Sequence, residues 1–283
     1  MTISQEFTQE KEILLRKLND LKEIIKNSNY MPEEDVSLYM EKIDRVMKEV
    51  ENEKLKLVFF GSFSSGKSTI LSSLTENLSI KIAPEPTTDK VQAYEYRDYL
   101  LVDTPGLFSE KIPHDELTIK YMSEADLIIF VTEAENPLKE SQHEVIKWIL
   151  KDLGKINQTI FVVNKMDNIA DITDREDFEK NCKIKKEVIK DTIEKLTGNR
   201  IEDKLIICLS ADPNGMGLDY WFERKEEYRE YSNIEALEVL INSVVNEKKE
   251  NLRKNTIEAV LRDLNIRGLE IIKEKKELIK PNI

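Results

Sequence analysis

One eight-residue segment, Gly-Ser-Phe-Ser-Ser-Gly-Lys-Ser at residues 61–68, limits the folds open to this chain more than any other feature. It follows the apolar run at residues 55–60 and precedes a helix-like run at residues 69–74. A strand, a glycine loop and a helix in this order are typical of a P-loop, whose backbone N–H groups surround a phosphate chain. Lys67 can reach the β- and γ-phosphates, and Ser68 is placed to bind Mg²⁺.

A second segment, residues 100–106, follows in the order that a GTP-binding domain requires. Its apolar residues are typical of a buried strand, which ends at Asp103. That carboxylate suits a contact with Mg²⁺ through bound water, and the N–H of Gly106 can meet the γ-phosphate. A purely structural role, as an aspartate that forms a turn, stays open as the alternative.

Two later apolar runs complete the pattern. The first ends in Asn164-Lys165-x-Asp167, and the second ends at Ser210 and Ala211. Asp167 can accept hydrogen bonds from the ring N–H and the exocyclic amino group of guanine, whereas adenine lacks that amino group. A backbone N–H at the end of the second run can contact the guanine carbonyl. Four such segments in sequence, each at the end of a strand, predict a site for a guanine nucleotide.

The composition indicates a cytoplasmic protein with no general affinity for nucleic acids. The 283 residues are 40% apolar and 35% charged, which is enough for one large domain or two. The net charge of −12 repels a phosphate backbone. The only two cysteines, Cys182 and Cys208, are expected to be reduced thiols rather than part of a disulfide framework.

The apolar periodicity divides the chain into three segments. Residues 1–53 carry apolar positions at helical spacing, interrupted near Pro32, and predict two helices. Residues 54–232 alternate apolar strands with helices, which is typical of a mostly parallel sheet covered on both faces. Residues 233–283 again predict helix, with Gly268 as an expected interruption. We therefore predict an α/β P-loop NTPase fold plus a bundle of N- and C-terminal helices; helices that only cover the sheet are the alternative.

The motifs resemble those of the dynamin superfamily. Residues 61–68 are similar to the Gly-x-x-Ser-x-Gly-Lys-Ser loop of dynamins. Residues 83–89, Ala-Pro-Glu-Pro-Thr-Thr-Asp, are similar to switch I of Eps15-homology-domain ATPases and of bacterial dynamin-like proteins. A helix pair before the nucleotide domain and a long helix after it also fit the neck bundle of that superfamily. The resemblance covers the whole chain as an architecture, and its specific motifs lie between residues 61 and 211.

The resemblance implies a role for each matched position. Thr88 becomes the switch I threonine that contacts Mg²⁺ and holds the attacking water, with Thr87 as its substitute; a rigid surface loop is the alternative. Ser64 falls where some members hold a potassium or sodium ion. The motifs and the resemblance together place contacts to GTP or GDP at Gly61, Ser62, Phe63, Ser64, Ser65, Gly66, Lys67, Ser68, Thr69, Thr87, Gly106, Asn164, Lys165, Asp167, Ser210 and Ala211. Contacts to Mg²⁺ are expected at Ser68, Thr88 and Asp103, and catalysis at Thr88, Ser64 and Lys67.

Two positions depart from better-known GTPases. Leu107 stands where Ras-like proteins carry a catalytic glutamine, and Phe63 stands where eukaryotic dynamins offer a glutamine to the water. Neither side chain can orient water. We therefore expect catalysis to depend on Thr88, Mg²⁺, a monovalent cation at Ser64 and groups that dimerisation brings into order.

The resemblance implies a GTP-hydrolysing motor domain that dimerises with nucleotide and remodels membranes. Lipid contact is expected through regions beyond this chain, so that the full-length protein would be cytoplasmic and peripheral at the membrane. Three alternatives stay open: an ATP-binding protein like the Eps15-homology ATPases, an Era-like regulatory or assembly GTPase, and a scaffold that does not hydrolyse nucleotide. The acidic composition counts against the Era-like alternative, because proteins of that kind bind RNA or ribosomes.

Overall fold

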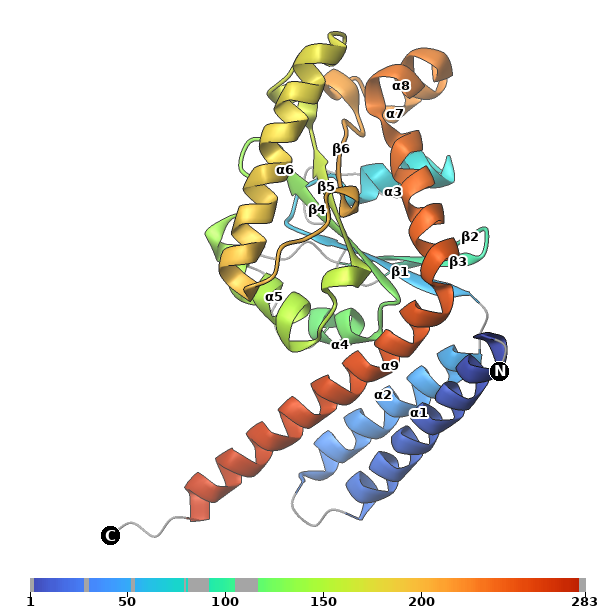
Figure 1. The fold of residues 1–283 in the computed structure, drawn as a ribbon, viewed down its shortest axis with the longest axis vertical. Helices are drawn as coiled ribbons and strands as arrows, with labels where there is room; N and C mark the ends of the chain where they lie inside the picture. The colour runs from blue at the N-terminus through green and yellow to red at the C-terminus, as the bar shows by residue number, and fades with distance from the viewer. Residues whose placement is uncertain are drawn as a thin grey trace.

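A six-stranded sheet forms the centre of the chain (Figure 1). The computed structural model describes residues 3–27, 31–51, 54–78, 80, 92–104 and 117–279. The strands are β1 (Leu55–Gly61), β2 (Gln92–Tyr96), β3 (Tyr99–Asp103), β4 (Leu127–Glu133), β5 (Thr159–Asn164) and β6 (Ile206–Cys208). Their order is β2-β3-β1-β4-β5-β6, and β2 pairs antiparallel with β3 while the other neighbours pair parallel. The predicted mostly parallel sheet is confirmed.

The sequence of each strand matches its place in the sheet. Every residue of β1 and β5 is buried, because a central parallel strand is covered on both faces and takes continuous apolar residues. The edge strand β2 instead has exposed and half-buried residues only. Register places Gly61 beside Val131, so β1 and β4 end at the same edge of the sheet. Asp103 and Asn164 end β3 and β5 there, which brings the predicted motifs to one edge.

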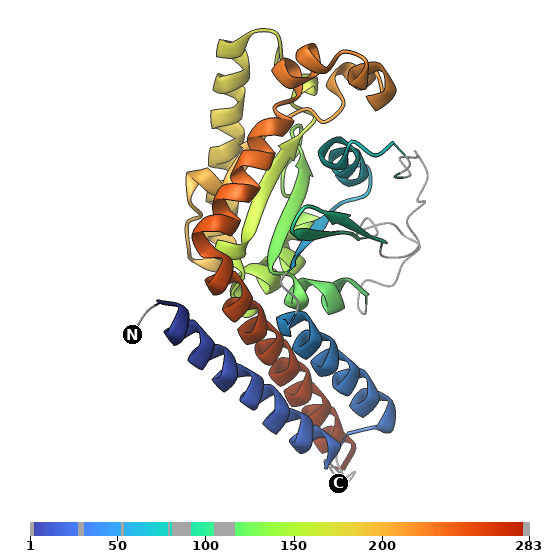
Figure 2. The ribbon, with the colours of Figure 1, turned by 90° about the vertical axis from the view of Figure 1, so that its right-hand side faces the viewer.

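Helices cover both sides of the sheet (Figures 1 and 2). They are α3 (Lys67–Thr75), α4 (Leu117–Glu124), α5 (His143–Lys147), which continues as a π-helical turn at Trp148–Asp152, α6 (Arg175–Thr197), α7 (Leu218–Phe222) and α8 (Lys225–Ser232). The helix α3 packs beside the long helix α9 (Ile234–Ile279), and α5 packs beside α6. Figure 1 shows α6 and the start of α9 on either side of the strands.

The helix α9 joins two hydrophobic cores. Its first half packs into the core of the sheet through Ile234, Leu237, Ile241 and Val244. Its second half contributes Ile257, Val260 and Leu264 to a separate core with α1 (Ile3–Lys26) and α2 (Glu33–Glu51). The side chains from those two helices are Leu18, Ile25, Tyr39, Ile43 and Val46. The helix runs through Gly268 without the expected interruption. Because α9 belongs to both cores, the domain boundaries at residues 53 and 232 stay predictions.

Buried polar contacts fix the bundle to the sheet. Asp126, which precedes β4, accepts a hydrogen bond from the backbone N–H of Lys56 at 2.9 Å and pairs with Arg253 of α9 at 3.1 Å. Arg45 of α2 contacts Glu124 of α4 at 2.9 Å, and within the bundle Lys42 of α2 pairs with Asp263 of α9. A buried charge that loses its partner is costly, so these contacts favour one orientation of the bundle.

The length and composition of the described helices indicate whether any of them could cross a membrane. None of those within residues 3–27, 31–51, 54–78 and 117–279 combines the length and the apolar character that a membrane span needs.

Candidate nucleotide-binding site

The loop between β1 and α3 has the conformation that its glycines permit. Gly61, Ser64 and Gly66 have φ angles of 149°, 61° and 93°. A Cβ atom at Gly61 would lie 2.1 Å from the carbonyl oxygen of Val131, and one at Gly66 would lie 2.1 Å from the side-chain nitrogen of Asn164. A larger residue at either position would collide with these neighbours. Ser64 is exposed in this loop, whereas Phe63 is half-buried.

Lys67 begins α3 and turns its side chain back over the loop. Its Nζ donates hydrogen bonds to the carbonyl oxygens of Gly61 at 3.0 Å and of Ser62 at 2.8 Å. Burial lowers the pKa of Lys67 to about 8, and the charge of Asp103 opposes this shift in part. The partners in the loop are neutral carbonyls, so an anion beside Nζ would stabilise the ammonium form.

Ser68 and Asp103 meet at the edge of the sheet. The Ser68 hydroxyl donates to Oδ2 of Asp103 at 2.9 Å. Burial raises the pKa of Asp103, and Lys67 and the hydrogen bond from Ser68 oppose that rise. The second oxygen, Oδ1, is buried and has no hydrogen-bond partner among the described residues. A carboxylate oxygen without a partner beside a serine hydroxyl fits Mg²⁺, which prefers oxygen ligands and bound water.

Asn164 links three loops through its amide group. Its Nδ2 donates to the carbonyl oxygen of Ser65 at 2.9 Å. Its Oδ1 accepts from the backbone N–H of Ala211 at 2.9 Å. Both contacts are buried, so the loops after β1, β5 and β6 are fixed relative to one another.

Asp167 is held beside the same loops. Its backbone N–H donates to the Ser210 hydroxyl at 3.0 Å, and its Oδ2 accepts from the backbone N–H of Asn214 at 3.0 Å. Its Oδ1 has no hydrogen-bond partner among the described residues. The neighbouring Lys165 has a φ of 61° and donates to Glu133 at 2.7 Å. The arrangement therefore leaves an acceptor oxygen next to the loop of Ser210.

Several residues of the site carry no motif that would identify them in the sequence. Gln142 donates from Nε2 to the Ser62 hydroxyl at 2.9 Å, which supports the phosphate loop from the side. The Tyr228 hydroxyl donates to the carbonyl oxygen of Ala211 at 2.8 Å. Burial acts to raise the pKa of Glu133, but the hydrogen bonds and charges of Lys165 and Lys139 outweigh it, and the pKa is lowered.

The predicted residues fall into two groups. The described residues of the four motifs lie at one edge of the sheet: those of the phosphate loop and Asp103, and those from Asn164 to Ala211 that the motifs predict. Thr69 is half-buried in the first turn of α3. Thr87, Thr88, Gly106 and Leu107 lie outside the described residues. Their roles stay predictions.

Two family models match the chain. A model described as a 50S ribosome-binding GTPase matches residues 56–165, and a model described as a dynamin-like helical domain matches residues 196–283. The first covers the strands from β1 to β5, and the second covers β6 and all of α9. The match to the GTPase model is therefore followed in the chain by the match to the dynamin-like helical model.

Three similar proteins are named as dynamins or GTPases. The structure of the LeoA bacterial dynamin GTPase from ETEC is 29% identical with a TM-score of 0.60, covering 96% of this chain and 49% of that one. Dynamin-like protein 1 of Campylobacter jejuni is 24% identical over 78% of this chain and 28% of its own length. A probable transmembrane GTPase, FZO-like, of Arabidopsis thaliana is 28% identical over 51% of this chain and 18% of its own length. The chain thus spans less than half of each of these relatives.

Lys67 gives the site a testable pH dependence. Phosphate oxygens beside Nζ would raise its pKa from about 8, so binding of GDP is expected to take up a proton at about pH 9 and much less at about pH 7. Calorimetric titration in buffers of different ionisation enthalpy measures this uptake. The Lys67→Arg variant, which stays charged at both pH values, should lose the difference. Equal uptake by the unmodified chain at both pH values would contradict the assignment.

Proposed function

We propose that the chain is a GTPase of the dynamin superfamily, which binds GTP and GDP with Mg²⁺ and hydrolyses GTP as the motor part of a membrane-remodelling protein. The observation that carries this proposal is the position of Asn164 and Asp167. The amide of Asn164 joins the phosphate loop to the loop of Ala211, and Asp167 keeps a buried acceptor oxygen beside them. These contacts support the proposal because they join the loops proposed for the phosphates and for the base.

Guanine is the base that this acceptor favours. Its ring N–H and exocyclic amino group are two adjacent donors, and a carboxylate has two acceptor oxygens. The Oδ1 of Asp167 is free among the described residues, while Oδ2 receives the N–H of Asn214 at 3.0 Å and has lone-pair capacity for a second donor. Adenine offers no such pair of donors, so the same geometry argues against the ATP-binding alternative.

We expect the residues at the start of α3 to bind the phosphates and, together with Asp103, Mg²⁺. Lys67, once it turns from the loop carbonyls to the phosphates, would place its charge at the β- and γ-phosphates. Ser68 and Asp103 would hold Mg²⁺, and Thr88 would complete its contacts. When bound, Mg²⁺ neutralises negative charge that develops on the phosphate oxygens.

We expect Asp167 to decide nucleotide choice. Asp167→Asn should weaken GTP binding about 10- to 100-fold, because a donor replaces one acceptor, and should favour the xanthine nucleotide, whose ring carbonyl accepts from an amide. Titration with labelled GTP, ATP and xanthosine triphosphate measures both effects. Asp219→Asn, an exposed change of the same charge on α7, is the matched control and should bind GTP normally. Equal affinity of the unmodified chain for ATP and GTP would remove the assignment.

Hydrolysis is the second part of the proposal. Phe63 is half-buried in the phosphate loop and has no group that can hold water, so the glutamine of other dynamins has no counterpart there. We propose that Thr88 holds the water and that a potassium or sodium ion at the exposed Ser64 adds positive charge. A second copy of the chain would order these loops, which makes the active site dependent on dimerisation.

Turnover should therefore depend on protein concentration. At low concentration hydrolysis is expected to be slow, and the rate per molecule should rise as GTP-bound chains pair. Thr88→Ala should remove most of the remaining rate at every concentration. Phosphate release over a dilution series, with analytical ultracentrifugation at the same concentrations, tests both statements. A rate per molecule that is fast and the same at all dilutions would rule out completion of the site by a partner copy.

An Era-like function is the second candidate, because one matching family is described as ribosome-binding. Against it stand the net charge of −12 and the dynamin-like helical match at residues 196–283. Proteins that bind RNA need basic surface to contact the phosphates. Retention on RNA that weakens with salt would favour this second function over the first.

We propose that membrane remodelling needs more than these residues. No described helix can span a bilayer, and the chain spans 49% of the LeoA structure. We therefore expect the 283 residues to bind nucleotide but to remain in the supernatant when anionic liposomes are sedimented. Tight liposome binding that requires GTP would contradict this division of roles.

A further inference from the structure

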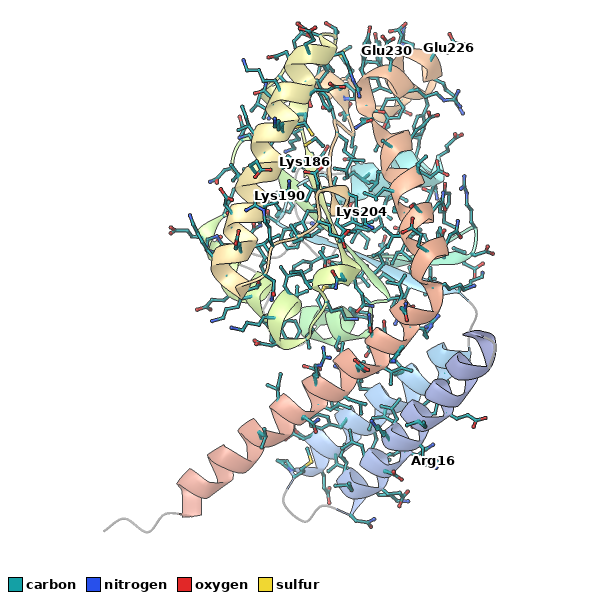
Figure 3. All side chains as sticks on the ribbon, viewed as in Figure 1. Arg16, Lys186, Lys190, Lys204, Glu226 and Glu230 are labelled. Atoms are coloured by element: carbon teal, nitrogen blue, oxygen red, sulfur yellow. The ribbon has the colours of Figure 1, made fainter. Side chains whose placement is uncertain are left out.

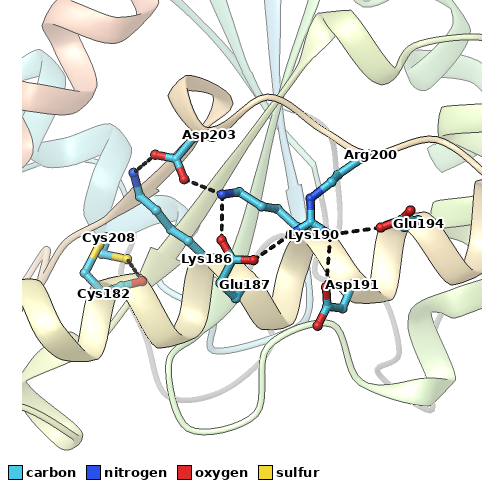
Figure 4. Close-up of polar contacts among 9 residues, drawn as sticks. All are labelled: Cys182, Lys186, Glu187, Lys190, Asp191, Glu194, Arg200, Asp203 and Cys208. Carbon is cyan, nitrogen blue, oxygen red and sulfur yellow. Dashed lines mark hydrogen bonds and ion pairs between the residues drawn. The ribbon is translucent and has the colours of Figure 1, made fainter.

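The two cysteines of the chain lie side by side although 26 positions separate them. Cys182 is half-buried in α6, and Cys208 is buried at the end of β6. The Cys208 thiol donates a hydrogen bond to the carbonyl oxygen of Cys182, with sulfur and oxygen 3.7 Å apart (Figure 4). One cysteine on a helix and one on the adjacent strand thus lie together in the core of the sheet.

A pocket of about 620 Å³ lies beside this pair. It lies at β6, which is the last strand of the described sheet and pairs there with β5. Cys182 and Cys208 both line it, together with Phe178 and Ile206 on its apolar side. Lys186 and Lys204, both labelled in Figure 3, line its charged side. None of the predicted nucleotide contacts that the structure describes lines this pocket, so it is separate from the candidate nucleotide site.

The hydrogen bond between the two cysteines distinguishes the two sulfurs, whereas the charges of Lys186 and Asp203 shift the pKa of both thiols in the same directions. The hydrogen bond with Cys208 and the charge of Lys186 lower the pKa of Cys182, although burial opposes them. The hydrogen bond with Cys182 and burial raise the pKa of Cys208. Lys186 pairs with Asp203 at 2.9 Å, and the charge of Asp203 opposes part of the effect of Lys186 on the Cys182 thiol. Cys182 is therefore the sulfur that ionises first and attacks, since the thiolate is the nucleophile.

We propose that Cys182 and Cys208 are an oxidation site that hydrogen peroxide reaches through this pocket. The Cys182 thiolate attacks one peroxide oxygen, so that an S–O bond forms, the O–O bond breaks and hydroxide leaves to become water. Cys208 then attacks the sulfur of the Cys182 sulfenic acid. An S–S bond forms, the S–O bond breaks, and a second water leaves with the Cys208 proton. The two sulfurs lose two electrons in total, and the peroxide gains them.

The position of the bond gives it a structural consequence. Cys208 is two residues before Ser210 in the chain, and its carbonyl oxygen accepts a hydrogen bond from the Asn233 side chain at 2.8 Å. A disulfide would join α6 covalently to the strand that leads into the loop of Ser210. Oxidation would therefore restrain this edge of the sheet next to the start of α9.

Peptide mapping of the full chain tests the proposal. After an equimolar dose of hydrogen peroxide, digestion without reductant should yield one species that links the peptides of Cys182 and Cys208, and dithiothreitol should separate them. In Cys208→Ser, dimedone should trap a sulfenic acid at Cys182, whereas Cys182→Ser should give no adduct. Lys186→Gln should slow oxidation several-fold at about pH 7, and Lys183→Gln, one lysine of the same pocket without a contact to Asp203, should not.

Three results would overturn it: both thiols intact after peroxide, disulfides only between two chains, or sulfinic and sulfonic acids without linked peptides. If the buried Cys208→Ser change prevents folding, the unmodified chain still decides the order of attack. Iodoacetamide should then alkylate Cys182 before Cys208, and the reverse order would refute the assignment of the attacking sulfur.

Discussion

The two hydrogen bonds of the Asn164 side chain are the interaction on which the rest of the site depends. One amide satisfies the carbonyl of Ser65 and the N–H of Ala211, and both contacts are buried. Loss of the amide would leave two backbone groups without partners, at a cost of about 1 to 3 kcal/mol each. The same side chain occupies the space that a Cβ at Gly66 would need, which explains the glycine there.

The helix α9 extends this rigid unit toward the bundle. The backbone N–H of Ser210 donates to the carbonyl oxygen of Ser232 at 3.0 Å, and α9 begins two residues later. Farther along, Arg253 pairs with Asp126 beside β4, and Leu264 packs with α1 and α2. One helix therefore starts at the loop that we assign to guanine and ends in the helical core. A single helix thus connects the loop of Ser210 with the core that α9 forms with α1 and α2.

The sequence predicts the structural features that depend on residues close to one another in the chain. A strand, a glycine loop and a helix are local, so the P-loop and the ends of β3 and β5 follow from the residues themselves. Contacts between distant segments do not follow in this way. The hydrogen bonds from Gln142 to Ser62 and from Tyr228 to Ala211 depend on how the helices pack. Gly268 shows a related limit, because one glycine costs a helix only about 1 kcal/mol and α9 continues through it.

The proposed guanine site can be tested with a crystal structure that contains GDP and Mg²⁺. We expect the carboxylate of Asp167 to accept from the ring N–H and the amino group of guanine, with both hydrogen bonds of the Asn164 amide kept. Lys67 should contact the β-phosphate, and the Ser68 hydroxyl should bind Mg²⁺. A guanine base held by other residues, or phosphates bound away from residues 61–68, would contradict it.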